Sequence, residues 1–171
     1  MGTTPRVPHS CRVEADLVVP VEEVWQVVSD VTRTGEWSHE CLRVEWLDGA
    51  TQAAVGARFR GANKSLWMRW HRTSVMTEVS PGHTLAWRTI PTWRFVDSTE
   101  WRITLEPLAG GRTRIVQTYD VVRCPRWWEW LVARVNPPHR DRGEALAADL
   151  ARIGIVAAST GGPPPQAPPT D

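Results

Sequence analysis

Residues 97–121 read DSTEWRITLEPLAGGRTRIVQTYDV and predict two antiparallel strands joined by a short turn. Apolar side chains alternate with polar ones before and after Gly110-Gly111, which is the pattern of strands with one covered face. Paired glycines are typical of a hairpin turn. Ile103 and Leu105 define the inward face. The residues that share this face are Asp97, Thr99 and Trp101 on the first strand and Thr113, Ile115, Gln117 and Tyr119 on the second.

The same period of two continues on the N-terminal side of this hairpin. Strands are predicted near residues 42–46, 57–59, 66–79 and 85–89, with turns at Asp48-Gly49, Gly61-Ala62-Asn63 and Pro81-Gly82. In the run 66–79 both alternating sets are partly apolar, and a β-bulge would reconcile them. Residues 11–19 also alternate, and Pro20 ends that strand.

Two short helices are predicted after the first strand, and a long helix near the C-terminus. Val21, Val24, Trp25 and Val28 recur at helical spacing. Thr32 is a candidate cap for a second helical turn that runs to Trp37. Asn136-Pro137 is a helix-start signal. The apolar stripe of the long helix comprises Gly143, Leu146, Ala147, Leu150, Ile153, Gly154 and Ala157, and Asp149 is placed off this stripe.

This order of elements predicts an α+β fold of the helix-grip type. A curved antiparallel sheet of about seven strands wraps around the long C-terminal helix, with the two short helices after the first strand. Residues 10–157 are predicted to form a single domain, flanked by a flexible tail at 1–9 and a disordered Pro/Gly-rich tail at 158–171. A sheet bent around one helix leaves a gap between the two, and that gap is the candidate binding site.

The composition narrows the class of partner. The net charge of the 171-residue chain is +1, with both signs interspersed, which gives no overall field to attract nucleic acid or an anionic membrane surface. No run approaches the roughly 20 apolar residues that span a bilayer, so stable membrane insertion is not expected and a cytoplasmic location is predicted. Eleven Trp residues against one Tyr and two Phe suit a deep core or an apolar pocket.

Several phrases of the sequence resemble a known superfamily. They are VEEVWQVVSDVTRTGEWSHEC, VGARFRGAN, VSPGHTLAWR, STEWRITLEPLAGGRTRI and NPPHRDRGEALAADLARI, which lie within residues 12–156. With the order of elements, they resemble the START-like (SRPBCC, Bet v 1-like) superfamily, in particular its polyketide cyclase/dehydrase and lipid-transport branch. The resemblance implies a helix-grip cavity but names no ligand. His39 stands where look-alike sequences usually carry Pro.

The predicted function is the binding of a small hydrophobic molecule (lipid, polyketide or isoprenoid-like) by a carrier or sensor. A site of this kind combines apolar area with a few polar groups that orient the ligand. Trp37, His39 and Glu40 are expected at the cavity mouth, as a polar gate or a capped turn. The predicted wall comprises Phe59, Trp70, Trp87, Trp101, Ile115, Gln117, Tyr119, Leu146 and Leu150.

Two other functions stay open. The first is a cofactor-independent enzyme of the cyclase or dehydratase type, with Asp97 or Tyr119 as a weak candidate for the proton donor. The second is a protein-interaction module with a filled core that acts through residues 127–130. The three Trp residues in this segment cannot all face one way on a helix. The favoured interpretation is that they plug the end of the barrel, and the alternative is an exposed aromatic patch.

Neither a metal nor a cofactor is expected. The pairs His39/Cys41 and His9/Cys11 lack the spacing and the additional ligands of a zinc site. The three cysteines, Cys11, Cys41 and Cys124, are expected to be reduced thiols. His139 is expected to be a histidine satisfied within the core. The sequence leaves the identity of the ligand and the oligomeric state open.

Overall fold

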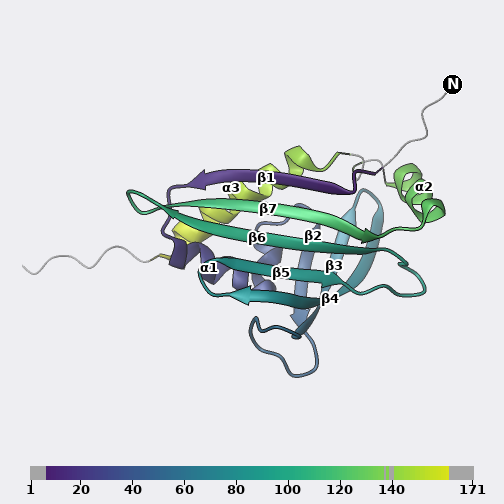
Figure 1. Cartoon of the computed structure of the whole chain (residues 1–171), viewed down its shortest axis with the longest axis horizontal. Helices are drawn as coiled ribbons and strands as arrows, with labels where there is room; N and C mark the ends of the chain where they lie inside the picture. Colours follow the sequence, from purple (N-terminus) through teal and green to yellow (C-terminus); the bar gives the residue numbers. More distant parts are fainter. Residues whose placement is uncertain (1–6, 137, 139–140, 162–171) are drawn as a thin grey trace, which may run out of the picture.

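A computed structural model describes residues 7–136, 138 and 141–161. Within these residues, a seven-stranded antiparallel sheet has the strand order β1-β7-β6-β5-β4-β3-β2 (Figure 1). The strands are β1 (Ser10–Leu17), β2 (Cys41–Trp46), β3 (Arg58–Ser65), β4 (Met68–Ser80), β5 (Thr84–Thr89), β6 (Ser98–Leu108) and β7 (Arg112–Arg123). The helices are α1 (Val21–Ser29), the 3-10 helix η1 (Val31–Glu36), α2 (Arg126–Val135) and α3 (Gly143–Thr160).

The β6–β7 hairpin has the predicted pairing. Ile103 lies opposite Gln117, and Leu105 lies opposite Ile115. Gly110 and Gly111 form the turn with φ angles of 77° and 66°, a backbone conformation that glycine adopts without steric cost. Ile103, Leu105, Ile115, Gln117 and Tyr119 are all buried, so the inward face predicted for this hairpin is confirmed.

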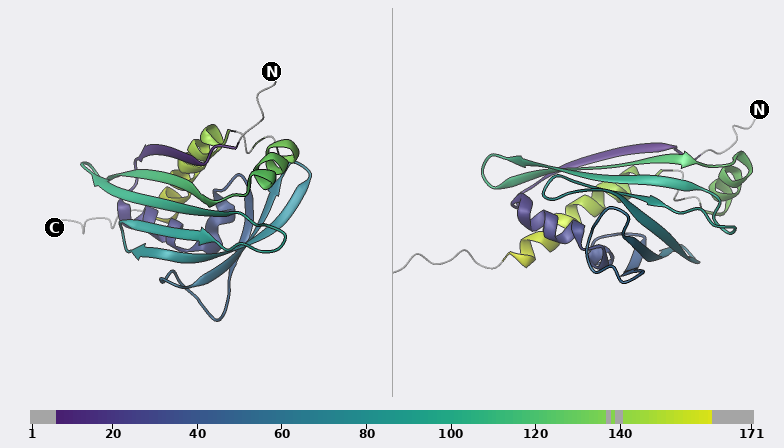
Figure 2. Two further views of the ribbon diagram at one scale, coloured as in Figure 1. Left: turned by 45° about the vertical axis from the view of Figure 1, so that its right-hand side comes forward. Right: turned by 60° about the horizontal axis from the view of Figure 1, so that its bottom comes forward.

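Helix α3 packs against the concave side of the sheet, which confirms the helix-grip fold. Figure 2 shows α1 and α3 on the same face of the sheet. The main core lies between these two helices and strands β1, β6 and β7, and it comprises Leu17, Val24, Val27, Ile103, Ile115, Leu150, Ile153 and Ala157 among others. A second core lies between η1 and strands β2 to β5, and it includes Val31, Val44, Phe59, Met76 and Leu85.

Two details of the strand prediction have different outcomes. The bulge expected in the run 66–79 is confirmed, because the pairing of β4 with β5 shifts between Met76 and Glu78. The turn at 61–63 is wrong, because these residues lie inside β3 and the chain reverses at Leu66, which has a φ of 53°. Gly61 leaves room for the Cys41 side chain on the neighbouring strand, because a Cβ atom at residue 61 would lie only 3.3 Å from the Cys41 Sγ atom.

The helix boundaries differ from the sequence signals at three points. The side chain of Asp30 caps η1 by accepting the Thr32 N–H, so Thr32 is not the cap. Asn136 ends α2, and α3 begins at Gly143. Helix α3 continues to Thr160, three residues beyond the predicted domain boundary at residue 157. The helix start expected at Pro137, the role of His139 and the predicted tails at 1–6 and 162–171 lie outside the described residues.

The packing of α3 predicts a strong asymmetry between its two faces. Leu150 is fully buried, whereas Ile155 on the same helix is 71% exposed. We expect Leu150→Ala to lower the free energy of unfolding by about 2–5 kcal/mol, because it leaves a cavity in the core. Ile155→Ala should change it by less than about 0.5 kcal/mol. Urea unfolding of both variants checks this, and equal losses would contradict the packing described.

Candidate functional site

A cavity of about 240 Å³ opens between the sheet, η1, α2 and the first turns of α3. The wall residues predicted from the sequence that line it are Phe59, Trp70, Trp87, Trp101, Gln117, Tyr119 and Leu146. The three residues predicted for its mouth, Trp37, His39 and Glu40, also line it, as does Asp97. Within α3 only Leu146 and Asp149 face the cavity, so the void lies where this helix begins.

Two predicted wall residues do not line the cavity. Ile115 and Leu150 are fully buried in the main core, where the C-terminal part of α3 packs directly on the sheet. Both side chains do point inward, as their spacing predicts. Ile115 on β7 and Leu150 on α3 pack in the same core, because the gap between the sheet and α3 closes after Asp149.

Aromatic rings from neighbouring strands form one wall of the cavity. Trp87, Trp101 and Tyr119 are successive cross-strand neighbours on β5, β6 and β7. The rings of Trp87 and Trp101 stack at 6.4 Å with an angle of 8° between them, and the Trp101 and Tyr119 rings lie 5.0 Å apart. Phe59 meets the Trp87 ring edge-on at 6.4 Å. This row supplies a continuous apolar surface for a ligand.

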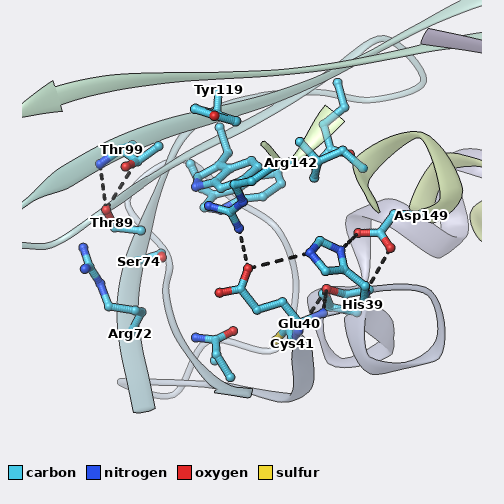
Figure 3. A pocket seen from close by; sticks show the side chains of 18 of the residues that line it. His39, Glu40, Cys41, Arg72, Ser74, Thr89, Thr99, Tyr119, Arg142 and Asp149 are labelled. Carbon is cyan, nitrogen blue, oxygen red and sulfur yellow. Dashed lines mark hydrogen bonds and ion pairs between the residues drawn. The ribbon is translucent and has the colours of Figure 1, made fainter. Parts of the chain in front are cut away.

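Arg142, just before α3, places a cation over this wall. Its guanidinium carbon lies 5.1 Å from the centre of the Trp101 ring and 5.7 Å from that of Tyr119, within the range of a cation–π interaction. The same guanidinium donates a hydrogen bond to the Glu40 carboxylate (Figure 3). Glu40 is buried, and pairing with Arg142 compensates for the loss of water around both charges.

A second polar pair lies beside the first. The Nδ1 atom of His39 lies 2.7 Å from a carboxylate oxygen of Asp149, and the His39 backbone N–H donates to the other oxygen at 2.9 Å. The Nε2 atom of His39 lies 4.0 Å from the Glu40 carboxylate. Asp149, His39, Glu40 and Arg142 therefore form a chain of charged and polar groups along the cavity (Figure 3).

The position of Asp149 corrects the sequence prediction, which placed it off the buried stripe. Only 1% of the residue is exposed. Its carboxylate accepts hydrogen bonds from His39 and from Arg152, which also donates to the Trp37 carbonyl at 2.8 Å. A carboxylate at Nδ1 favours the histidine tautomer that carries its proton there. In the neutral ring this leaves Nε2 as the acceptor on the side of Glu40.

Asp97 is held in an ion pair at another part of the cavity. The Arg72 guanidinium contacts both carboxylate oxygens, at 2.9 and 3.1 Å, and donates to the Asp97 carbonyl at 3.0 Å. Arg72 also lies over the Phe95 ring at 5.3 Å. Because its oxygens are occupied by a cation, the Asp97 carboxylate is poorly placed to donate a proton to a bound molecule.

Besides the Nε atoms of Arg72 and Arg142, two buried polar atoms of the cavity wall have no hydrogen-bond partner among the described residues. They are the side-chain oxygen of Gln117 and the indole Nε1 of Trp37. Buried polar atoms are normally paired, since leaving one unpaired costs about 1–3 kcal/mol. An acceptor and a donor without partners in the wall of a void are available to a ligand that carries a hydroxyl or carbonyl group.

Burial keeps two potentially reactive groups protonated. It raises the pKa of the Cys41 thiol to about 11, so little thiolate is present at neutral pH. Burial also raises the pKa of Tyr119, although nearby Arg142 opposes this shift. The Tyr119 hydroxyl donates to the Pro8 carbonyl at 3.4 Å. Neither residue is suited to act as a nucleophile or a base at neutral pH.

The sequence prediction missed Arg72, Arg142 and Asp149. Arg72 shares the inward phase of β4 with Trp70 and Ser74, so alternation carried a signal for it. Asp149 is three residues after Leu146 on a helix, which is also the spacing of one face. Arg142 lies outside any periodic segment, and no sequence signal indicates its position.

Two features are absent from the described residues. Among them, no three His, Cys, Asp or Glu side chains come together as ligands for a metal ion. In the same part of the chain, no helix has both the length and the apolar character needed to cross a membrane.

The chain is similar to solved structures of low sequence identity, which share its fold. Protein TTHA0849 from Thermus thermophilus matches with a TM-score of 0.65 and 15% identity, covering 90% of this chain and 99% of that one. The Zhui aromatase/cyclase from Streptomyces sp. R1128 matches with a TM-score of 0.64 and 20% identity, covering 88% and 94%. Protein DR_A0006 from Deinococcus radiodurans matches with a TM-score of 0.60 and 18% identity, covering 85% and 95%.

The sequence comparisons give a family but no curated relative. No curated protein matches the chain. The profile of the family described as polyketide cyclase / dehydrase and lipid transport matches residues 8–152, which is most of the chain. Together with the helix-grip fold and its lined cavity, this match shows that the chain belongs to the polyketide cyclase/dehydrase and lipid transport family.

Proposed function

We propose that the protein binds a small hydrophobic molecule with a hydroxyl or carbonyl group in this cavity, as a carrier or sensor. The observation that supports this most directly is the combination of the aromatic row with the unpartnered Gln117 oxygen and Trp37 indole N–H. The row supplies apolar area for affinity, and the two polar atoms supply orientation. The family to which the chain belongs includes lipid transport in its description.

The size of the cavity favours a compact ligand. Its volume of about 240 Å³ lies at the lower end of the range for ligand pockets, which is roughly 300–1,000 Å³. Stacked Trp rings form its wall, and flat rings pack well against flat ligands. A ring system with one or two polar substituents fits these features better than a long acyl chain.

Filling the cavity should weaken ligand binding. Ser74 lies on the inward face of β4 and lines the cavity, whereas Thr73 lies on the opposite face. We expect Ser74→Phe to weaken the binding of the probe 2-naphthol by roughly tenfold or more, because the new ring occupies the void. Thr73→Phe, as the matched control, should change the affinity by less than about twofold. Calorimetric titration measures both, and equal affinities would contradict a ligand site here.

The Gln117 side chain should form a hydrogen bond with the polar group of the ligand. One hydrogen bond contributes about 0.5–1.5 kcal/mol, so 2-naphthol should bind the wild type roughly 2- to 13-fold more tightly than naphthalene. In Gln117→Leu this preference should disappear. In Thr118→Leu, on the outer face of the same strand, it should persist. A preference that survives in Gln117→Leu would argue against the role given to this side chain.

A second candidate function is supported by the His39–Asp149 pair. A carboxylate that holds Nδ1 and leaves Nε2 facing a cavity is an arrangement suited to general acid–base catalysis. An aromatase/cyclase is among the solved structures with the same fold. In this alternative His39, rather than Asp97 or Tyr119, would move the proton.

Mass spectrometry distinguishes the two functions. A carrier returns its ligand unchanged, so we expect wild-type protein and His39→Asn, purified from the source organism, to carry the same bound mass in native spectra. Asn retains the backbone N–H that donates to Asp149. An enzyme whose proton transfer was lost would instead carry substrate in the variant and product in the wild type. Two different bound masses would therefore favour the enzyme.

A further inference from the structure

We propose that the end of the molecule formed by α2 docks on an anionic membrane surface, from which the apolar ligand enters the cavity. This inference rests on the proposed binding function for the identity of its cargo, but the docking surface has its own observations. These are the gathering of exposed tryptophans, the sign of the charges among them and the two faces of α2.

The exposed tryptophans of the described chain gather at one end. They are Trp67 in the β3–β4 turn, Trp93 in the β5–β6 loop, and Trp127 and Trp130 on α2, with exposed fractions of 79%, 88%, 60% and 50%. The three segments that carry them meet at the end of the sheet that holds α2, on the right in Figure 1. We call these four residues the docking surface.

Two contacts tie these segments together. The Ser65 hydroxyl, beside the β3–β4 turn, donates to the Asn136 side-chain oxygen at 2.9 Å, at the end of α2. The rings of Phe95 from the β5–β6 loop and Trp128 from α2 meet edge-on at 6.0 Å. The expectation that residues 127–130 plug the barrel is therefore wrong for Trp127 and Trp130. It holds only for Trp128, which faces the cavity.

The exposed charges in the chain segments that carry these tryptophans have one sign. In the segments 64–69, 90–97 and 122–136, the exposed charged residues are Lys64, Arg69, Arg94, Arg123, Arg126 and Arg134. The acids of the same segments, Asp97 and Glu129, are half-buried and face Arg72 and His9. The net charge of +1 for the whole chain conceals this local excess. An amphipathic aromatic surface with a basic rim is complementary to anionic headgroups.

The two faces of α2 connect this surface with the cavity. Trp128, Glu129 and Val132 line the cavity from the inner face. Trp127, Trp130 and Arg134 lie at i, i+3 and i+7 on the outer face, and the Arg134 guanidinium lies 6.0 Å from the Trp130 ring. One ten-residue helix thus separates the void from the docking surface, and its displacement would open a path between them.

Vesicle co-sedimentation tests the proposal. We expect the wild type to bind vesicles of equal parts phosphatidylglycerol and phosphatidylcholine, to bind pure phosphatidylcholine vesicles much more weakly, and to be released by added NaCl. Trp127→Ala combined with Trp130→Ala should weaken binding roughly tenfold, as should Arg126→Glu combined with Arg134→Glu. The matched controls are Ile155→Ala on α3 and Arg112→Glu at the opposite end of the sheet, and neither should alter binding.

A second readout does not depend on weakened binding. Trp127→Phe combined with Trp130→Phe keeps apolar rings, so this variant should still sediment with anionic vesicles. The quenching of its Trp fluorescence by brominated lipid should fall relative to the wild type, because two indoles next to the lipid are gone. Unchanged quenching would place the contact elsewhere and overturn the proposal.

Other outcomes separate this proposal from the binding function. If the wild-type protein binds poly-glutamate but no vesicles, the proposal of a membrane partner is overturned and an acidic protein partner is favoured. Vesicle binding that the Trp→Ala and Arg→Glu variants leave unchanged would overturn the assigned surface. None of the altered residues lines the cavity, so all variants should bind 2-naphthol like the wild type. If 2-naphthol does not bind the wild type while the vesicle results are as expected, the proposed docking surface is supported and the proposed ligand-binding function is overturned.

Discussion

The contact between the apolar stripe of α3 and the concave face of the sheet is the constraint on which the rest of the structure depends. Leu150, Ile153 and Ala157 are fully buried against the core shared with α1 and the β6–β7 hairpin. This contact holds the sheet curved around one helix. It also ends toward the beginning of α3, at Leu146 and Asp149, and there the same curvature leaves a void. The core and the cavity are therefore two consequences of one packing arrangement.

The polar groups of the cavity follow from the way α3 is joined to the segment after η1. Asp149 sits on the inward face of α3, where an aliphatic side chain would continue the stripe. Its carboxylate instead joins α3 to the segment after η1 through His39, and Arg152 ties the same segment through the Trp37 carbonyl. Because Glu40 and Arg142 pair beside them, four polar groups are compensated close to an apolar wall. Such networks fix side chains in one arrangement, which a selective site requires.

The sequence predicted the periodic parts of the fold and most of the cavity wall. Alternation in residues 97–121 was enough to place Trp101, Gln117 and Tyr119 on the inward face, because the side-chain period of a strand is fixed. Alternation does not distinguish an inward residue that lines the void from one that packs on α3, and for this reason the predicted wall includes Ile115. Helical spacing from Leu146 is compatible with an inward Asp149, but its hydrogen-bond partner His39 lies more than 100 residues away in the chain, and local spacing carries no information about that pairing. The sequence around Gly61 predicts a turn because glycine is common both in turns and at sites of close packing, and the pattern does not separate the two.

The tether between α2 and the rest of the molecule has a thermodynamic consequence. Among the described residues, the contacts that hold this helix include a side-chain hydrogen bond at Asn136, a ring contact at Trp128 and an ion pair between Glu129 and His9, and its two faces meet different environments. A molecule in the cavity that favours one position of α2 changes the affinity of the outer face of α2 for its partner. By thermodynamic linkage, that partner changes the affinity of the cavity by the same factor. Under the two proposals above, the ligand and the membrane surface would be reciprocal effectors, so that loading and release would need no source of energy beyond the difference between the two environments.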